Sequence, residues 1–476
     1  MALPQAEGIQ IEVMDLPPEG HRVVLGTAGS GKTTLAIYRA KYLSSITDDG
    51  KVLLLTFNKT LVKYLEAIAG GELSNVDVRN YHHFARGYLN ARGKMKGRNL
   101  IVSGMEDGEN RKLILVKEAQ RNVIRNVGIN STLKRDGEVF LEEISWIQKM
   151  GIKSLEEYKC AERIGRVGTR IIRENRKYFY MVYEEYKNVR TSEGYLYDWD
   201  DMASAVLDEF TNDNSRRMYK HIVIDEGQDL SPVMLKSLIK AIPADGSLTF
   251  FGDVGQQIYG NRVSWHSAGL NVNNKEIWRF DRNYRNSKQI AKLALAIAKS
   301  KYFAGESDLV EPVMPKASSP LPALVKFDDE VQEIEWLKDT VSKMPRNGLI
   351  AILVRSRKKV DEIDGMVREI GIRPQVLKSK MQALNNNAPL SIGTYHSAKG
   401  LEFDTVILPF CSTSELPSQD RITALESREE ALKEEVKLLY VAVTRAKKGL
   451  IITCSGEKTE LLPENTEMLY DERENL

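Results

Sequence analysis

Short apolar runs alternate with longer amphipathic segments at the start of the chain. HRVVL (21–25) and KVLLLTF (51–57) have the pattern of short buried strands. The segments that follow them, TTLAIYRAKYLSSI (33–46) and KTLVKYLEAIAG (59–70), have the pattern of helices. Strands that alternate with helices are typical of a parallel sheet, so this pattern predicts an α/β lobe.

Residues 105–195 have a different pattern, with many charges, few prolines and a helical period. RKLILVKEAQRNVIRNV and FLEEISWIQKM are examples. The pattern predicts that this region contains helices only and forms an insertion.

Strand patterns return after residue 220, and most of them precede a helical pattern. They are KHIVIDE (220–226), SLTFFGD (247–253), GLIAILV (348–354), LSIGTYH (390–396), DTVILPF (404–410) and GLIITC (449–454). A second α/β lobe is therefore predicted. The Pro-rich segment 309–323 predicts a linker or surface loop, and the acidic segment PENTEMLYDEREN predicts a frayed end.

Composition narrows the class of protein. A chain of 476 residues, 42% of them hydrophobic, is expected to form at least two domains. Long apolar runs and a signal-like start are missing, so we expect a soluble, cytoplasmic protein with no membrane partner. The three cysteines lie far apart and predict neither zinc binding nor disulfides. The formal net charge of +2 does not indicate a polyanion partner, although a local basic groove remains open.

The most specific motif is GTAGSGKTT at residues 26–34, which matches G-x-x-x-x-G-K-[ST] between a strand and a helix. In such a loop the backbone N–H groups bind phosphates, while Lys32 reaches the β and γ phosphates and Thr33 ligates Mg²⁺. An ordinary glycine turn is the alternative. The predicted ATP-binding residues of this loop are Gly26, Ala28, Gly29, Ser30, Gly31, Lys32, Thr33 and Thr34.

A second acidic motif, HIVIDEGQD (221–229), ends an apolar strand in Asp225 and Glu226. Asp225 is suited to hold Mg²⁺, and Glu226 to polarise the attacking water. A solvated strand end is the alternative. Asp225 follows Lys32 by 193 positions (225 minus 32), so an insertion must separate the two motifs. The guanine-reading motif of GTPases is not matched, because NKTL ends in Leu61.

Further motifs follow in a fixed order: FGDVGQQIYG (251–260), NYRNS (283–287), TYHSAKGLEFD (394–404) and LLYVAVTRAKKGL (438–450). With the two motifs above, the chain resembles superfamily 1A helicases of the UvrD/Rep type. The resemblance implies an α/β fold with two RecA-like P-loop lobes. It assigns 1–87 and 201–275 to lobe 1A, 88–200 to the helical insertion 1B, and 276–476 to lobe 2A.

The resemblance also implies roles at an ATP site. Gln256 is similar to the γ-phosphate sensor, and Arg285 and Arg445 to the arginines that neutralise the transferred phosphoryl group. The residues similar to the other ATP contacts are Gln10 and Tyr284 at adenine, Glu402 at the ribose, and Gly400.

A helical pattern gives a separate expectation for Arg445. Leu432, Val436, Leu439 and Val443 form an apolar stripe, and Arg445 falls nearly opposite it. We therefore expect Arg445 on the exposed side of its helix, where it can reach the other lobe, although a merely solvated arginine is the alternative.

Four segments are similar to those that line the nucleic-acid path of the family, where aromatic side chains stack on bases. The predicted contacts are Thr56, Phe57, Asn58, His82, Tyr259, Arg262, Trp265, Thr394 and His396. For any single aromatic residue among them, the alternative is that its side chain lies in the core or in a loop and does not contact nucleic acid. Asn261 stands where relatives often have Trp, and Trp265 is expected to substitute for it.

The spacing of the last motifs points to a compact form. Residues 287 and 394 are 107 positions apart, a length nearly filled by the strands and helices of one lobe, so the 2B insertion of the family is expected to be absent. Similar compact helicases occur beside a nuclease in bacterial defence systems such as Gabija. The resemblance implies a 3'-to-5' translocase or helicase on single-stranded DNA that hydrolyses ATP with Mg²⁺. The alternatives are a regulatory ATPase subunit with a nuclease partner in an anti-phage complex, and a P-loop kinase or GTPase.

Overall fold

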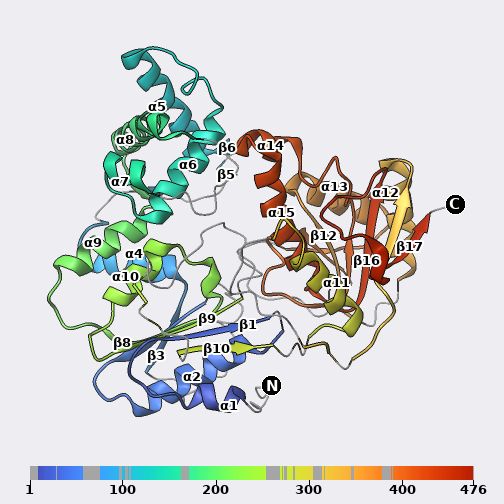
Figure 1. The fold of residues 1–476 in the computed structure, drawn as a ribbon, viewed down its shortest axis with the longest axis horizontal. Coiled ribbons are helices and arrows are strands. Elements are labelled where there is room, and N and C mark those ends of the chain that lie inside the picture. Colours follow the sequence, from blue (N-terminus) through green and yellow to red (C-terminus); the bar gives the residue numbers. More distant parts are fainter. Residues whose placement is uncertain are drawn as a thin grey trace.

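The computed structural model places three bodies beside one another: a first lobe, a helical insertion above it, and a second lobe in contact with both (Figure 1). It describes residues 9–27, 29–56, 75–95, 99–101, 105–106, 109–161, 171–253, 269–270, 272, 276–281, 283, 285–303, 313–315, 317–344, 348–377, 388 and 390–474. Both large sheets consist of parallel strands, which confirms the α/β prediction.

The first lobe is a parallel sheet of order β10-β1-β9-β8-β2-β3. Its strands are β1 (Arg22–Gly26), β2 (Lys51–Leu55), β3 (Val76–Arg79), β8 (Tyr219–Ile224), β9 (Ser247–Gly252) and β10 (Ile277–Phe280). Helices α1 (Ile9–Met14) and α2 (Lys32–Ile46) contribute to the core on one face, and α4 (Tyr81–Ala91), α9 (Met202–Asn212) and α10 (Pro232–Lys240) to the core on the other. Strand periodicity explains this division, since Val23 and Leu25 enter one core and Val24 the other.

Two expected boundaries of the first lobe need correction. β10 pairs with β1, so the first sheet continues past residue 275. Helix α4 runs across the expected boundary between residues 87 and 88. Its residue Leu89 is buried in the core of the first lobe, so this lobe continues past residue 87. A four-residue strand and an uninterrupted helix leave no boundary signal in the sequence.

The insertion contains α5 (Arg111–Val127), α6 (Gly137–Met150), α7 (Leu155–Cys160), the 3-10 turn η1 (Arg173–Asn175) and α8 (Arg176–Ser192). The rings of Phe140 and Phe179 stack in its core with centroids 4.5 Å apart. The prediction of helices only in residues 105–195 is wrong, because β5 (Met105–Glu106) pairs with β6 (Glu109–Asn110) inside that range. At its edges, β4 (Asn99–Ile101) pairs with β7 (Tyr195–Asp198). Strands of two to four residues are too short to show a period of two.

The second lobe is a parallel sheet of order β13-β14-β12-β15-β16-β11-β17. Its strands are β11 (Ala323–Phe327), β12 (Ile350–Val354), β13 (Gln375–Val376), β14 (Ser391–Thr394), β15 (Phe403–Leu408), β16 (Ala446–Ser455) and β17 (Asp471–Glu474). Helices α11 (Lys288–Ala298) and α15 (Arg428–Val443) pack on one face, and α12 (Glu330–Lys343) and α13 (Arg357–Glu369) on the other. The short helix α14 (Gln419–Leu425) precedes α15.

The acidic segment near residue 471 is not frayed, contrary to the prediction. β17 pairs in parallel with β11, while its side chains are all exposed. Backbone hydrogen bonds hold this strand, and the side-chain pattern therefore does not reveal it. Across the described ranges, no helix has the length and apolar character needed to cross a bilayer.

Candidate functional site

The phosphate-loop motif lies between β1 and α2, as predicted. Gly29 and Gly31 have φ values of 76° and 84°, which favour glycine. A Cβ at Gly29 would lie 2.4 Å from Cβ of Arg285, so the loop packs directly against the NYRNS segment. The buried Lys32 donates from Nζ to the carbonyl oxygens of Gly26 at 2.8 Å and Thr27 at 2.7 Å.

The residues predicted to bind metal touch each other. Oγ1 of Thr33 donates to both carboxylate oxygens of Asp225 at 3.1 Å. Burial and the neighbouring Glu226 raise the pKa of Asp225 to about 7. Hydroxyl and carboxylate oxygens are the ligands that Mg²⁺ prefers, and a bound cation would favour the ionised form of Asp225. This donor set therefore fits Mg²⁺.

Glu226 follows Asp225 at the end of β8, in a left-handed conformation with φ of 55°. Nε2 of Gln228 donates to its Oε2 at 2.5 Å. Burial alone would raise the pKa of Glu226, but Lys399, Lys32 and Arg445 outweigh it and lower the pKa. Glu226 is thus held ionised by cations from both lobes, a state suited to accepting a proton.

The second lobe contributes charged side chains to the same place. Nη2 of Arg285 lies 2.6 Å from Oε1 of Glu402, and Nζ of Lys447 lies 3.0 Å from Oε2 of Glu402. Lys399 forms an ion pair with the buried Asp229 of the first lobe. Nε and Nη1 of Arg285 are buried and have no hydrogen-bond partner among the described residues. These N–H groups fit the oxygen atoms of a phosphate.

Arg445 lies in this site but not on an exposed helix face, so that expectation was wrong. Helix α15 ends at Val443, and nearly all of its residues after Glu434 are buried. Arg445 is 1% exposed and donates from Nε to the carbonyl oxygen of Val441 at 3.0 Å. Burial and the nearby Arg285 lower its pKa to about 10.

Some of the remaining predicted ATP contacts belong to the described residues, and others do not. Ser30 is buried in the loop, and Thr34 lies in the first turn of α2. Gly400 has a φ of 78° and precedes Leu401, whose carbonyl oxygen accepts a hydrogen bond from Nη1 of Arg445. Ala28, Gln256 and Tyr284 lie outside the described residues, as does the side chain of Gln10.

Three further charged residues of the site were not predicted as site residues, although each lies inside one of the motifs quoted above. They are Asp229, Asp253 and Lys399. Asp253 lies 4.0 Å from Nζ of Lys32, and its backbone N–H donates to Oε1 of Gln228 at 3.0 Å. Gln228 thereby connects the ends of β8 and β9, next to Glu226.

The predicted nucleic-acid contacts are only partly described. Phe57, Asn58, Tyr259, Arg262 and Trp265 lie outside the described residues. Thr56 is buried and donates to Asp225 at 3.4 Å, so its hydroxyl faces the candidate metal site instead.

His82, His396 and Thr394 occupy partly buried positions. The ring of His82 lies 4.3 Å from the ring of Trp199, and burial lowers its pKa to about 4. Burial, with Arg355, Lys399 and Arg421 nearby, lowers the pKa of His396 to about 4 as well. Oγ1 of Thr394 accepts a hydrogen bond from the backbone of Ser397. Both histidines are thus neutral at pH 7 and offer rings rather than charge.

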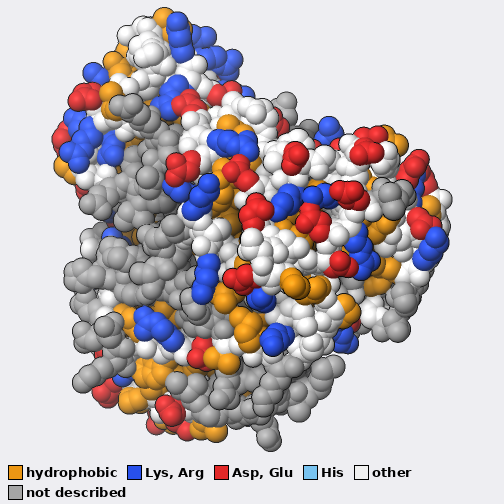
Figure 2. All heavy atoms as spheres, turned by 45° about the vertical axis from the view of Figure 1, so that its right-hand side comes forward, with side chains coloured by type: hydrophobic (Ala, Val, Ile, Leu, Met, Phe, Trp, Pro, Cys, Tyr) orange, Lys and Arg blue, Asp and Glu red, His pale blue; other side chains and the backbone are white. Residues whose placement is uncertain are grey.

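Charges of both signs are mixed on the surface. Figure 2 shows acidic and basic side chains interspersed over the visible face of the second lobe. This agrees with the net charge of +2 and means that this face has no field of a single sign to attract a polyanion from a distance.

Comparison with known proteins covers both lobes. The UvrD/REP helicase N-terminal domain family matches residues 8–276, and the UvrD-like helicase C-terminal domain family matches residues 375–457. A probable DNA helicase of Mycoplasma pneumoniae is 24% identical over 91% of this chain and 80% of its own length.

Two longer relatives match in part. The ATP-dependent DNA helicase UvrD2 of Mycobacterium bovis is 24% identical over 76% of this chain and 53% of its own length. The ATP-dependent DNA helicase srs2 of Schizosaccharomyces pombe is 24% identical over 75% of this chain and 42% of its own length. This chain thus spans about half or less of these two relatives.

Proposed function

This chain belongs to the UvrD-like superfamily 1 DNA helicases, and from that membership we propose that it is an ATP-dependent translocase or helicase on single-stranded DNA, moving 3'-to-5'. One observation carries the proposal. Lys32 and Glu226 of the first lobe and Arg285, Lys399 and Arg445 of the second contribute their charges to one buried site.

Each charged residue has a distinct task in this proposal. Lys32 and Arg285 bind the phosphates of ATP, and Arg445 neutralises the charge that develops on the transferred phosphoryl group. Glu226 accepts a proton from the attacking water. Thr33 and Asp225 would hold Mg²⁺, whose positive charge would offset the negative charge of the phosphates.

Further contacts complete the nucleotide site. Glu402 binds the ribose, and its ion pairs with Arg285 and Lys447 fix its carboxylate. Backbone N–H groups of the loop at Gly29 and Ser30 bind phosphate oxygens. Gln10, Tyr284 and Gln256 keep the roles that the family resemblance gives them.

The site couples chemistry to movement because it consists of two halves. ATP binds best when the lobes are closed, since Arg445 and Arg285 then meet the phosphates that Lys32 holds. Hydrolysis removes this preference, and the lobes reopen. A strand that crosses both lobes near His396 and Thr394 advances with each cycle.

A second candidate is a regulatory ATPase subunit of a nuclease-containing anti-phage complex in the cytoplasm. The observation that favours it is the compact second lobe. The described segments between residues 287 and 394 form α11, β11, α12, β12, α13 and β13, all of which belong to that lobe. A chain without a 2B insertion depends more on a partner for strand separation.

Two measurements test the proposal. We expect single-stranded DNA to stimulate ATP turnover of the wild type, and Glu226→Gln to abolish turnover while it still binds DNA. Strand displacement is measured on duplexes with a 3' or a 5' tail, and the 3' tail should be required. DNA-independent turnover would contradict the proposal, and strong stimulation without any displacement would favour the second candidate.

A further inference from the structure

Among the described residues, charged side chains of the helical insertion contact the second lobe where α6 meets α14. Helix α6 of the insertion contacts α14 of the second lobe, and Figure 1 shows the two close together. Nη1 of Arg421 on α14 donates to Oε1 of Glu142 on α6 at 2.7 Å. Nε of Arg135, in the insertion, donates to Oε1 of Glu426 at 2.8 Å. In the part of the chain that the structure describes, the Arg421–Glu142 and Arg135–Glu426 ion pairs therefore connect these bodies.

Arg421 also has a partner in its own lobe. Its Nε donates to Oε2 of Glu434 on α15 at 2.9 Å. If the insertion and the second lobe move apart, the Arg421–Glu434 pair stays intact, because both residues lie in the second lobe. The Arg421–Glu142 and Arg135–Glu426 pairs break, because each of them joins the two bodies. The side chains of Arg421 and Glu142 are 22% and 30% exposed, so water reaches them and the bridge can open.

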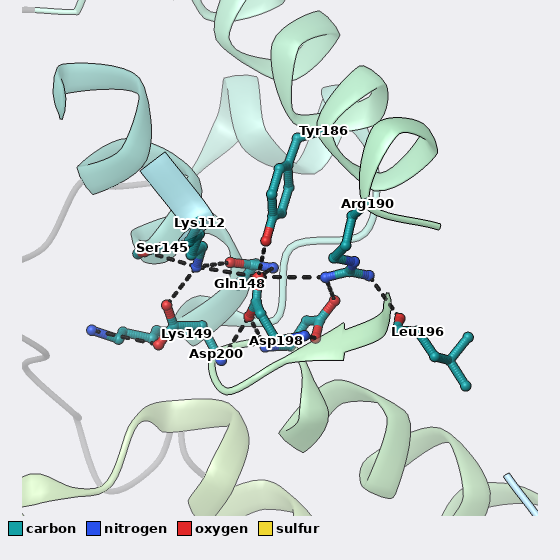
Figure 3. A network of polar contacts seen from close by, with 10 residues as sticks. Lys112, Ser145, Gln148, Lys149, Tyr186, Arg190, Leu196, Asp198 and Asp200 are labelled. Carbon is teal, nitrogen blue, oxygen red and sulfur yellow. Dashed lines mark hydrogen bonds and ion pairs between the residues drawn. The ribbon is translucent and has the colours of Figure 1, made fainter. Parts of the chain in front are cut away.

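The insertion is joined to the first lobe at its base, after β7. A buried cluster of Lys112, Gln148, Tyr186 and Asp198 joins α5, α6 and α8 to the end of β7, where the chain returns to the first lobe (Figure 3). Helix α6 also contacts α10 of the first lobe. Opening of the lobes therefore strains the bridge to α14 rather than the base of the insertion.

The charge of Arg421 acts on His396, a predicted nucleic-acid contact of the second lobe. His396 has three cations near it, Arg355, Lys399 and Arg421. Each of these is held by carboxylates, since Arg355 donates to Glu435 at 2.7 Å and Lys399 pairs with Asp229. Carboxylates and phosphates compete for the same planar guanidinium donors.

We propose that the Arg421–Glu142 and Arg135–Glu426 pairs form a latch across the single-strand path. With no strand bound, Glu142 holds Arg421 and ties the insertion to the second lobe. When a strand enters, Arg421 exchanges Glu142 for a backbone phosphate, and the insertion is released. This inference rests on the proposed function, because it assigns a further contact to the same nucleic-acid path.

Closed-circular single-stranded DNA tests the latch, because a circle has no end to thread and enters only when the latch opens. The rates of association of a circle and of a linear strand of equal length are compared by stopped-flow fluorescence. Glu142→Gln should raise the circle-to-linear rate ratio roughly two- to fivefold, the effect expected of one partly exposed bridge. Glu138→Gln, which removes the same charge one helical turn away, should leave the ratio unchanged.

Arg421→Gln separates the latch from the phosphate contact. It should also raise the rate ratio, but equilibrium binding should weaken, and the slope of log K against log salt should fall by about 0.7, the loss of one contact on a single strand. Glu142→Gln should keep the wild-type slope. Arg428→Gln, in the same lobe, is the control, and thermal unfolding checks that each variant is folded.

The possible results are distinct. An unchanged rate ratio in Glu142→Gln, with normal DNA binding, overturns the latch and leaves the proposed function intact. An unchanged salt slope in Arg421→Gln overturns the exchange onto phosphate. A wild type that binds neither circle nor linear strand overturns the proposed function and this inference together.

Discussion

Two buried Lys–Asp pairs of this molecule have opposite net pKa shifts, although burial acts on both pairs in the same direction. In the nucleotide site, burial lowers the pKa of Lys32 and raises that of Asp225, so both shift toward their neutral forms. At the base of the insertion, burial would do the same to Lys112 and Asp198. Their mutual attraction outweighs it, raising the pKa of Lys112 and lowering that of Asp198.

The contacts explain the difference. Oδ2 of Asp198 accepts from Tyr186 at 2.7 Å and Gln148 at 3.0 Å, and lies 3.3 Å from Nζ of Lys112 (Figure 3). In the nucleotide site Arg285 keeps two buried N–H groups without a protein partner among the described residues, Nε and Nη1, whereas at the base of the insertion Arg190 keeps one, at Nε. A cluster that satisfies its own charges is structural, whereas one that leaves them strained is prepared for ligands.

The largest expected effect removes one charge from the nucleotide site. Arg445→Gln should lower DNA-stimulated ATP turnover by roughly 10³-fold or more, the range found for arginines that stabilise phosphoryl transfer. Its thermal stability without nucleotide should not fall much, because the change relieves repulsion with Arg285. Turnover and thermal unfolding are measured together. A large loss of stability with normal turnover would reverse the comparison.

The matching change at the insertion should have the opposite profile. Asp198→Ala leaves Lys112 and Arg190 buried without their main partner and should cost about 3–5 kcal/mol in the free energy of unfolding. Urea unfolding followed by fluorescence measures the loss. Asp208→Ala, which removes an exposed carboxylate paired with Lys153, is the control and should unfold like the wild type.

The bridge between Lys399 and Asp229 lies between these extremes. Although Lys399 is its partner, burial raises the pKa of Asp229 to about 6. Lys399→Gln should weaken nucleotide binding about tenfold, because it leaves a carboxylate buried alone and disfavours closure. Asp229→Asn should have a smaller effect, since its amide still accepts a hydrogen bond. Equal effects in a titration with a fluorescent ATP analogue would contradict this asymmetry.

The smallest effect concerns pH. Burial lowers the pKa of His396 to about 4, below its ordinary value near 6.5, so the unfolded chain binds a proton that the folded chain excludes. Stability from this group is present above pH 6.5 and is lost as pH falls toward 4. Between pH 7 and pH 6 the loss should be under about 1 kcal/mol. His396→Gln should flatten this part of the pH profile in urea unfolding, whereas the exposed His83→Gln should not.

The sequence predicted the parts that depend on local spacing. Lys32 and Thr33 sit where the motif requires, because a loop between a strand and a helix is determined by neighbouring residues. The pairing of Asp229 with Lys399, 170 positions apart, comes only from the packing of two lobes. β17 was missed because its exposed side chains carry no pattern.

Arg445 shows a different kind of failure. The apolar stripe on α15 is real, but the helix is buried on its other sides too, so its opposite face does not meet water. An apolar stripe on a helix predicts that the opposite face is exposed to water only when the rest of the protein covers the apolar face alone. The predicted exposure of Arg445 was therefore wrong because α15 lies inside the second lobe.

The left-handed backbone at Glu226 has a consequence for anyone who evolves this protein for heat tolerance. A side chain with a Cβ pays about 1–2 kcal/mol to hold that conformation, whereas glycine holds it without strain. Screens for thermal survival alone would thus enrich Glu226→Gly and return robust but inert clones. Robustness selections on this scaffold need a turnover screen in every round.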